Sequence, residues 1–443
     1  MQEVTLQQIL DARESRVALQ KSLLNKYKAP LVCFTMNIAG PIKTSPLIER
    51  AFYDGVKVLQ SKLPQKSILH KEIDVSVTGC QAMFCVSVDA QKLKTICTEI
   101  EDSCSVGRLF DMDVLDTSGK KLNRQNLRGC IVCGRSGREC AAGRLHSVQE
   151  IQEVTQKIIT DHFFYKDCER FSNLATQSLL DEVYTTPKPG LVDRRNNGSH
   201  KDMDVNAFVK SARSLTPYFS QCVKIGYETS NQPPAYTFQK LREAGVAAEA
   251  TMYKATGGVN THKGAVYSFG IILGALGRLY KCELEFAGCD KVLSLCSDMC
   301  KEAVKSDFLS IDNTTAGGRL YLEHKLTGIR GEAASGFRSV KNIGLPVYQR
   351  LIDSGFTSND AGAVTLLHLI SAVQDTNLYH RGGSQGAEYA AASAKRLLSE
   401  NPTPSKEQTE KLDDDFISRN LSPGGCADIL AVTYFLFKLN LEK

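Results

Sequence analysis

The chain has 443 residues, 42% of them hydrophobic, which is enough for two or three globular domains. Its formal net charge of +5 is small for this length, and the basic residues are dispersed along the chain. A nucleic-acid-binding protein would be expected to show a basic stripe, so this class is disfavoured. Arginines placed near acids fit a phosphate-rich small ligand better.

Compartment and membrane association are indicated by the cysteines and the apolar runs. Residues 1–24 have the pattern of an amphipathic helix and lack the uninterrupted apolar stretch of a signal peptide. The longest apolar run, Ala265–Leu279, is shorter than a membrane span. Fifteen cysteines without an export signal indicate reduced thiols. We therefore expect a soluble, cytoplasmic protein without a membrane partner.

Strand and helix patterns alternate over the first third of the chain. The expected strands are Leu31–Ile38, Glu72–Val77, Ala82–Val88 and Gly107–Leu115, and the expected helices are Pro46–Leu63 and Ala90–Glu101. Strands interleaved with helices predict an α/β or α+β domain.

The last of these strands carries two acids. Side chains alternate between the faces of a strand, so Asp111 and Asp113 should project from the same face. Two carboxylates at this spacing can hold Mg²⁺, and Arg108 could bind a phosphate through two parallel hydrogen bonds. The alternative is an ordinary pair of solvated acids at a strand end.

A cysteine- and arginine-rich block follows. Cys130, Cys133, Cys140 and His146 form an acceptable Cys₃His set for Zn²⁺, although their gaps are shorter than in common zinc ribbons. A redox pair or inert thiols are the alternatives. The neighbouring arginines, among them Arg144, could bind phosphates whether or not a metal is present.

Helical periodicity dominates from about residue 151, and we place a domain boundary near residues 165–172. The expected helices are Val205–Gly226, Thr237–Lys254, Gly264–Tyr280, Lys291–Lys305, Asp360–Val373, Gln385–Ser399 and Asp428–Leu441. Strand patterns nearly vanish in this part of the chain. The turns between helices are where an all-α enzyme would place its site.

The segment Glu182–Met203 is the most polar of these connections. Two prolines and a glycine within four residues stiffen it, since proline fixes φ and restricts the preceding residue. Charged side chains surround this rigid turn, and loops commonly carry function. The alternative is an ordinary solvated connection. Its candidate functional residues are Lys188, Asp193, Arg194, His200 and Asp202.

Glycine-rich turns recur at the predicted helix ends. The turn at 256–264 leads into a helix, whose N-terminus would offer N–H groups and a positive dipole to phosphates. Similar turns occur at 313–319, 374–384 and 422–428 and before Ala333. A generic helix cap explains any one of them. Together they indicate several helix ends converging on a polyphosphate and its metal.

These residues resemble known families. The resemblance to the triphosphoribosyl-dephospho-CoA synthase family covers about residues 168–443 and rests on five segments: Glu182–Met203, Gly258–Gly264, Gly328–Ala333, Asp375–Asn377 and Pro423–Ala431. The N-terminal third resembles apo-citrate lyase phosphoribosyl-dephospho-CoA transferase through Gly107–Val114 and Arg128–His146. The whole chain thus resembles the fused form, which implies an α/β or α+β transferase domain at 1–167 and an all-α synthase domain at 168–443.

The resemblance implies two reactions. The C-terminal domain would join ribose C1″ of ATP to a ribose hydroxyl of 3′-dephospho-CoA and release adenine. The N-terminal domain would transfer the phosphoribosyl-dephospho-CoA unit to a serine of the citrate lyase acyl carrier subunit and release pyrophosphate. Mg²⁺ is the expected metal, and the acyl carrier subunit is the expected protein partner.

Physical chemistry then suggests roles for the candidate residues. A carboxylate should stabilise oxocarbenium character as the N-glycosidic bond breaks, and one should deprotonate the attacking hydroxyl. The carboxylate candidates are Asp193, Asp202, Glu332 and Asp375. His200 or His262 could protonate the departing adenine. Lys188, Lys263 and Arg330 would hold the triphosphate with Mg²⁺. Further expected contacts to the nucleotides are Arg194, Gly257, Gly258, Asn260, Thr261, Gly264, Gly424 and Gly425.

In the N-terminal domain, Asp111 and Asp113 would hold Mg²⁺ at the α-phosphate, with Asp74 the best guess for a third carboxylate. Arg108 and Arg144 would stabilise developing charge. Two other functions stay open at this point. One is the equivalent enzyme pair acting on the malonate decarboxylase carrier subunit, and the other is a zinc-containing nucleotide-binding regulator without turnover.

Overall fold

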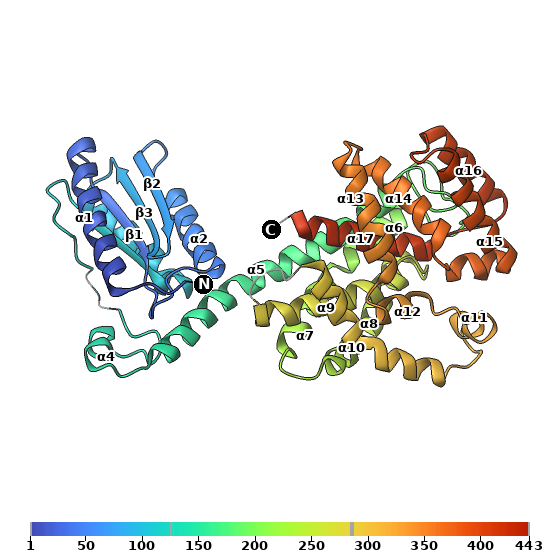
Figure 1. Ribbon diagram of the computed structural model, residues 1–443, viewed down its shortest axis with the longest axis horizontal. Helices are drawn as coiled ribbons and strands as arrows, with labels where there is room; N and C mark the ends of the chain where they lie inside the picture. Colours follow the sequence, from blue (N-terminus) through green and yellow to red (C-terminus); the bar gives the residue numbers. More distant parts are fainter. Residues whose placement is uncertain (1, 125, 127, 284–287, 442–443) are drawn as a thin grey trace. The chain divides into compact units, whose positions relative to one another are not determined.

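The computed structural model describes residues 2–124, 126, 128–283 and 288–441. The chain divides into two compact units, Met1–Lys166 and Asp167–Lys443, which are described separately below (Figure 1). Met1, part of the helix expected at 1–24, lies outside the described residues.

The first unit is built on a four-stranded sheet in the order β2-β3-β1-β4, and each neighbouring pair of strands is antiparallel. Parallel βαβ units would have made an α/β fold, so the antiparallel pairing selects α+β. Its elements are α1 (Leu6–Tyr27), β1 (Leu31–Met36), α2 (Pro46–Lys62), β2 (Ile68–Ser76), β3 (Gly79–Val86), α3 (Ala90–Asp102), a 3₁₀ turn (Val106–Leu109), β4 (Phe110–Leu115) and α4 (Gly137–Gly143).

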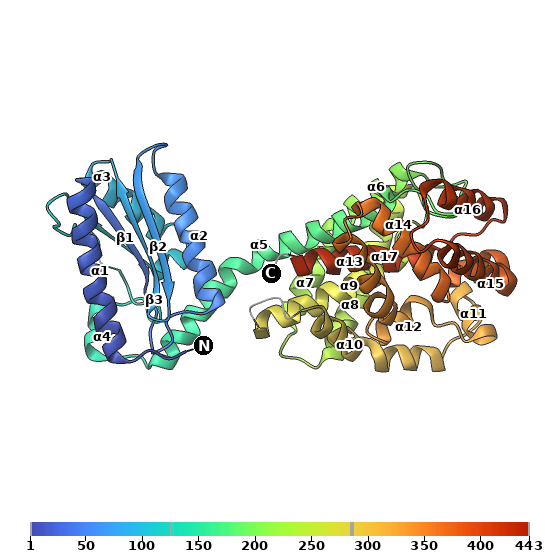
Figure 2. The same ribbon diagram turned by 45° about the horizontal axis from the view of Figure 1, so that its top comes forward.

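Helices cover both faces of this sheet (Figures 1 and 2). On one face, Leu23 and Leu24 of α1 form a buried cluster with residues of β1, β3 and β4. On the other face, α2 packs Phe52 against Phe34 of β1, with ring centroids 5.1 Å apart. Apolar side chains thus form a core on both faces of the sheet, while Asp111 of β4 lies at an exposed position.

Among the described residues of the second unit, all regular secondary structure is helical. Helix α5 (Val148–Tyr184) begins in the first unit and ends in the second. The remaining helices are α6 (Val205–Ser214), α7 (Thr216–Glu228), α8 (Pro234–Thr256), α9 (Lys263–Glu283), α10 (Cys289–Leu309), α11 (Ala316–His324), α12 (Gly328–Ala334), a π-helical turn (Val340–Gly344), α13 (Leu345–Asp353), α14 (Ser358–Ala372), α15 (Thr376–Glu400), α16 (Lys406–Ser418) and α17 (Gly424–Leu441).

Several expectations about these helices need correction. The single helix expected at 205–226 is two helices that meet at Leu215, because the next helix starts with Pro at its first turn. The turn expected at 328–333 is the short helix α12. The glycines at 382–383 lie inside α15, where Gly383 has a non-helical φ of 64° and kinks the helix.

Helix α17 is long and apolar enough to cross a membrane by length and composition alone. Its side chains, however, are packed inside the second unit, where Leu430, Tyr434 and Phe435 are at most 1% exposed. This burial explains the hydropathy of the helix as that of a core element. The start of α17 also reaches the cavity described next.

Candidate functional site

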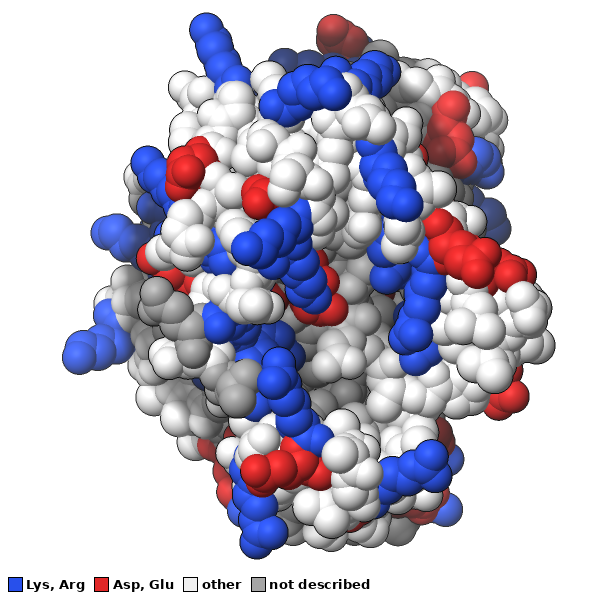
Figure 3. Space-filling view, turned by 90° about the vertical axis from the view of Figure 1, so that its left-hand side faces the viewer, with Lys and Arg blue, Asp and Glu red and all other residues white. Residues whose placement is uncertain are grey.

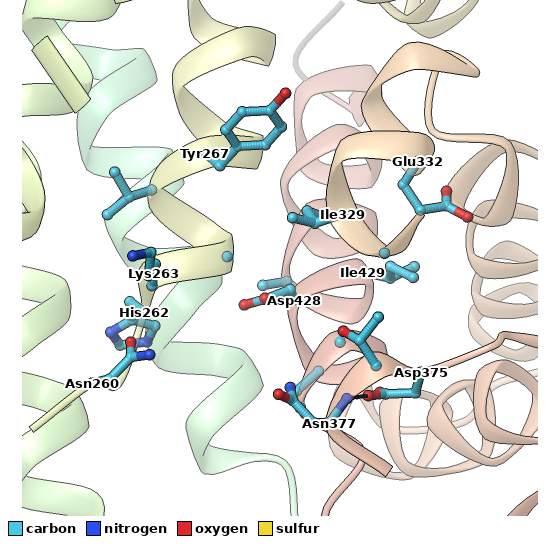
Figure 4. A pocket seen from close by; sticks show the side chains of 18 of the residues that line it. Asn260, His262, Lys263, Tyr267, Ile329, Glu332, Asp375, Asn377, Asp428 and Ile429 are labelled. Carbon is cyan, nitrogen blue, oxygen red and sulfur yellow. Dashed lines mark hydrogen bonds between the residues drawn. The ribbon is translucent and has the colours of Figure 1, made fainter. Parts of the chain in front are cut away.

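A cavity of about 1130 Å³ lies within the second unit. The N-terminal ends of α9, α12, α15 and α17 all contribute to its lining (Figure 4). Helix N-termini present unpaired N–H groups and positive dipole ends, so their meeting favours an anionic ligand. The volume exceeds the usual range for drug-sized ligands, which fits two nucleotide substrates.

Lys188 and Glu182 form a buried ion pair at this cavity. Lys188 is 1% exposed, and its ammonium donates a hydrogen bond to the Glu182 carboxylate. Burial raises the pKa of Glu182, although Lys188 opposes that rise. The stiff segment after α5 therefore carries a lysine into the interior, where an anionic ligand would meet it without competition from bulk water.

Asp375 ties two helix N-termini together. It caps α15 by accepting a hydrogen bond from the Asn377 N–H at 2.7 Å, and its other oxygen accepts from the Cys426 N–H of α17 at 2.8 Å. Gly425 lies close beside it, since an added Cβ would be 3.1 Å from Asp375 Oδ2, a tight contact. Burial raises the pKa of this carboxyl against the effect of those bonds. Its main role is thus to position the two helix starts.

Asp428, on the first turns of α17, faces the cavity from the opposite side to His262 (Figure 4). Burial raises its pKa well above the ordinary value, and the neighbouring carboxylates of Glu182 and Asp375 raise it further. The carboxylate lies against the backbone of Gly264 at the start of α9. A carboxyl with a high proton affinity beside a helix N-terminus is suited to accept a proton.

His262 is held by a short hydroxyl relay. The Thr261 hydroxyl donates to Ser211 Oγ at 2.7 Å, and Ser211 Oγ lies 2.7 Å from His262 Nδ1. If the Ser211 hydroxyl donates this hydrogen bond to Nδ1, the neutral ring carries its single proton on Nε2. Nε2 is buried and has no hydrogen-bond partner among the described residues. Burial, reinforced by the charge of Lys188, lowers the pKa of His262 to about 3, so the ring is neutral at pH 7.

His200 has partners on both ring nitrogens. Arg381 donates to Nδ1 at 3.0 Å, and Nε2 lies 2.9 Å from Ser422 Oγ. Burial and the Arg381 charge lower its pKa to about 4. Both candidate histidines therefore have lowered pKa values and are neutral at pH 7, which bears on the expectation that one of them protonates the departing adenine.

The other predicted residues at the cavity are more exposed. Lys263 forms an ion pair with Glu249 at 3.1 Å, and Glu332 accepts a hydrogen bond from the Ser339 hydroxyl at 2.5 Å. These side chains could change partners when a ligand binds. Further predicted residues along the lining are Asp202, Asn260, Gly264, Arg330, Gly424 and Gly425.

Four predicted residues lie outside the lining. Asp193 shapes the loop, accepting from the Lys188 N–H at 2.8 Å and the Arg195 N–H at 2.7 Å. Arg194 instead lies over the Tyr184 ring, 4.5 Å from its centroid. Gly257 and Gly258 have positive φ angles of 69° and 94° and end α8, so their glycine character is explained by the reversal of the chain.

The sheet of the first unit carries the other predicted site. Asp111 and Asp113 share a face of β4, because their β1 partners are Thr35 and Cys33. Although Asp111 is exposed, desolvation by nearby protein atoms raises its pKa, and the charge of Asp113 adds to that rise. Lys121 donates to Asp113 at 2.5 Å. Two carboxylates on one face of a strand, one of them with a raised pKa, suit a divalent cation.

Asp74 does not complete this pair. The register aligns Asp74 with Gln81, Gln81 with Thr35, and Thr35 with Asp111, so three strand spacings separate the two acids. At about 4.8 Å per spacing, they are about 14 Å apart, too far to share one ion. The guess that Asp74 supplies a third ligand is therefore wrong for a site centred on Asp111.

Arg108 tethers the cysteine-rich segment to the sheet. Its guanidinium donates to the Gly129 carbonyl at 2.7 Å, while Arg128 donates to the Phe110 carbonyl at 2.6 Å. The pair fastens the cysteine-rich segment to the start of β4, and Arg108 is thus not a free phosphate ligand. Arg144 is exposed and ends α4 in the left-handed region, with a φ of 46°. Figure 3 shows Lys and Arg side chains spread over this side of the molecule, with acids between them.

The four predicted zinc ligands come together. One ligand atom each from Cys130, Cys133, Cys140 and His146 lies within 4.8 Å of every other. No metal-binding group of three or more His, Cys, Asp or Glu other than this one occurs among the described residues.

Our sequence reasoning missed three charged groups at the large cavity. Asp428 was noted only as part of the glycine-rich turn at 422–428, and Glu182 only as the first residue of the stiff segment, so neither was given a role. Arg381 lies in the segment interpreted as a glycine turn. Asp428 could have been found from its position four residues after Gly424, because residues i and i+4 of a helix lie on the same face.

Comparisons with known proteins give the same division of the chain. Residues 168–443 match the model of the family described as ATP:dephospho-CoA triphosphoribosyl transferase, and residues 4–162 match that of apo-citrate lyase phosphoribosyl-dephospho-CoA transferase. A Haemophilus influenzae protein named Protein CitXG is 35% identical over 98% of this chain and 96% of its own length. Protein CitXG of Leuconostoc mesenteroides is 33% identical over 99% and 98%. A 2-(5''-triphosphoribosyl)-3'-dephosphocoenzyme-A synthase of Escherichia fergusonii is 42% identical over 60% of this chain and 89% of its own length.

Proposed function

We propose two reactions in sequence for this chain, which belongs to the ATP:dephospho-CoA triphosphoribosyl transferase family. Together with its N-terminal part, it is a bifunctional transferase of citrate lyase prosthetic-group biosynthesis. The second unit converts ATP and 3′-dephospho-CoA into 2′-(5″-triphosphoribosyl)-3′-dephospho-CoA and adenine. The first unit then transfers the phosphoribosyl-dephospho-CoA unit to a serine of the citrate lyase acyl carrier protein and releases pyrophosphate.

The first reaction exchanges two bonds at one carbon. The bond between ribose C1″ of ATP and adenine N9 breaks, and a ribose hydroxyl of dephospho-CoA forms a new bond to C1″. The hydroxyl proton passes to a base, while adenine leaves with the former bonding pair and gains a proton. The triphosphate is retained, which is consistent with a cavity of helix N-termini in place of an ATPase motif.

We assign the proton-accepting role to Asp428. Burial raises its pKa above the ordinary value, and a higher proton affinity makes a carboxylate a stronger general base. Its negative charge would also stabilise the oxocarbenium character that develops at C1″. Among the predicted carboxylates, Asp375 is occupied by backbone N–H groups and Asp193 shapes the loop, which supports the choice of Asp428.

His262 and Lys188 supply complementary groups. A neutral His262 with its proton on Nε2 can donate a hydrogen bond to the departing adenine as negative charge develops on it. Lys188, buried beside Glu182, can approach the triphosphate, with Lys263 and Arg330 at the more exposed part of the lining. Mg²⁺ bound to the same phosphates would neutralise part of their charge.

In the first unit, Asp111 and Asp113 are the groups that would hold Mg²⁺, and their shared face and the raised pKa of Asp111 fit that ion. Lys121, which now pairs with Asp113, is a cation within reach of a phosphate. Arg144 is exposed at the end of α4. It keeps the role proposed for it, which is to stabilise charge on the transferred group.

The observation that carries the first reaction is the convergence of four helix N-termini, Lys188 and Asp428 on one cavity. The experiment is chromatography of purified protein with ATP, dephospho-CoA and Mg²⁺. Adenine should accumulate only when dephospho-CoA is present. Formation of ADP, or adenine release that does not need dephospho-CoA, would contradict the proposed reaction.

A further inference from the structure

The segment 116–147 lacks a hydrophobic core of its own. Among its described residues, which exclude 125 and 127, Cys140 alone is buried, at 5% exposure. Chains that cannot bury enough apolar surface usually need a cross-link or a metal to fold. The fact that the one buried side chain is a cysteine indicates where such a link would form.

Three sulfur atoms and one imidazole surround a single point in this segment. The Cys133 and Cys140 Sγ atoms lie 3.4 Å apart, and all four ligand atoms lie within 4.8 Å of one another. Tetrahedral coordination at a Zn–S distance of about 2.3 Å places sulfurs about 3.8 Å apart. The four groups therefore need only small shifts to become ligands. All three cysteines are free thiols.

A second observation points to a missing ligand. His146 Nε2 is buried and has no hydrogen-bond partner among the described residues. A buried ring nitrogen without a partner costs free energy unless something satisfies it. The adjacent Ser147 caps α5 and fixes the end of the segment, since its hydroxyl accepts from the Glu150 N–H at 3.1 Å.

The turn at the first two cysteines is already shaped for a metal. The Cys130 carbonyl accepts from the Gly134 N–H at 2.9 Å, and the Val132 N–H points at Cys130 Sγ from 3.4 Å. Gly134 has a φ of 74°, which glycine adopts without strain. An N–H group directed at sulfur stabilises the thiolate form that binds metal.

We propose that Cys130, Cys133, Cys140 and His146 bind one Zn²⁺ and that this ion folds the segment 116–147. Three thiolates and an imidazole are soft and borderline ligands that select zinc over magnesium. A complete set of four protein ligands leaves no open position, so the role is structural and not catalytic.

The zinc site would act on the reaction centre of the first unit, at Asp111, through packing. The Gly129 carbonyl accepts from Arg108, and Arg128 donates to the Phe110 carbonyl, directly before Asp111. Zinc at residues 130–146 would hold this clamp in place against β4. Loss of the metal should therefore loosen the segment beside Asp111 without affecting the cavity residues of the second unit.

The first test is the metal content of the full chain, expressed with zinc supplied and purified without chelator. We expect about one Zn²⁺ per chain and a loss of most of it in Cys133→Ser. Cys104→Ser removes an exposed thiol outside the cluster and should keep the zinc. Wild-type protein without zinc, or with a Cys133–Cys140 disulfide as isolated, would overturn the proposal.

The second test uses the wild-type chain, so it does not depend on a variant that fails to fold. A chelator should release the zinc and expose the segment to trypsin at its Lys and Arg residues, such as Lys120, Arg135 and Arg138. Returning Zn²⁺ alone should restore protection. Equal cleavage of this segment with and without zinc would contradict its structural role, whichever reaction the protein catalyses.

Discussion

The carboxylate of Asp428 lies directly over Gly264, so close that a Cβ built on Gly264 would fall 1.9 Å from Asp428 Oδ2. The two residues come from helices far apart in the sequence, α17 and α9. The absence of a side chain at Gly264 thus lets the carboxylate approach the positive end of α9. We therefore interpret Gly264 as a residue that makes room for the Asp428 carboxylate at least as much as for a phosphate.

Replacement of that glycine should disable the first reaction. In Gly264→Ala the new methyl group must displace Asp428, and a shift of about 1 Å at a catalytic group can lower the rate about 100-fold. The measurement is the rate of adenine release. Gly245→Ala is the matched control, because its Cβ would meet Tyr218 Oη at an ordinary 3.6 Å. Equal rates for both variants would contradict the importance of the contact.

Removing the Asp428 charge tests the proton-accepting role. Asp428→Asn keeps the shape of the side chain and should lower adenine release by about 100-fold or more, the usual range for a lost general base. Asp298→Asn, at an exposed position on α10, should have no effect. In the unsubstituted protein the rate should fall as the pH is lowered through the raised pKa of Asp428. A variant with normal turnover would transfer the role to another carboxylate.

Acid stability should depend on His262. The folded-state pKa of about 3 lies below the ordinary value of 6.5, so between these values only the unfolded chain binds the proton. Stability from this group is complete above about pH 6.5 and falls with decreasing pH by up to about 1.4 kcal/mol per unit. Denaturant unfolding of His262→Gln should show a shallower pH dependence in this window, whereas exposed His324→Gln should follow the unsubstituted protein. Parallel curves for all three proteins would refute the prediction.

Variants of the Lys188–Glu182 pair can separate an effect on folding stability from an effect on catalysis. Lys188→Met leaves the Glu182 carboxylate buried without its partner, and such a change costs about 3–5 kcal/mol. Adding Glu182→Gln removes the uncompensated charge, so the double variant should recover much of that loss. Adenine release should stay low in both, because the proposed phosphate-binding cation is absent. Recovery of activity together with stability would show that the lysine only balances a charge.

Local patterns predicted much of the fold, since alternation and helical periodicity are properties of neighbouring residues. The strand carrying Asp111 and Asp113 and the helix beginning near Gly264 were both predicted in this way. The division of 205–226 into two helices and the continuous α5 were not, because a break can lie within a periodic run and a charged stretch can be helical when its neighbours bury one side. These outcomes depend on tertiary packing.

The candidate site was harder to predict because a residue type does not reveal its partners. Asp193 and Arg108 had the chemistry of catalytic groups, yet one shapes its own loop and the other binds a backbone carbonyl 21 residues away. Asp428 was expected beside a glycine-rich turn at a helix start, but a generic helix cap explains such a turn, so the pattern did not mark this carboxylate as catalytic. The role proposed for Asp428 depends on the meeting of α9 and α17, and no local pattern contains that information.

The central claim is that two separate sites carry out the two reactions, and Asp111→Asn tests it most directly. Adenine release and the mass gain of the acyl carrier subunit would be measured in parallel, with Asp11→Asn on the exposed surface of α1 as the control. We predict that Asp111→Asn abolishes carrier loading and leaves adenine release unchanged, because Asp111 belongs to the first unit. Loss of both activities in a correctly folded variant would contradict the account.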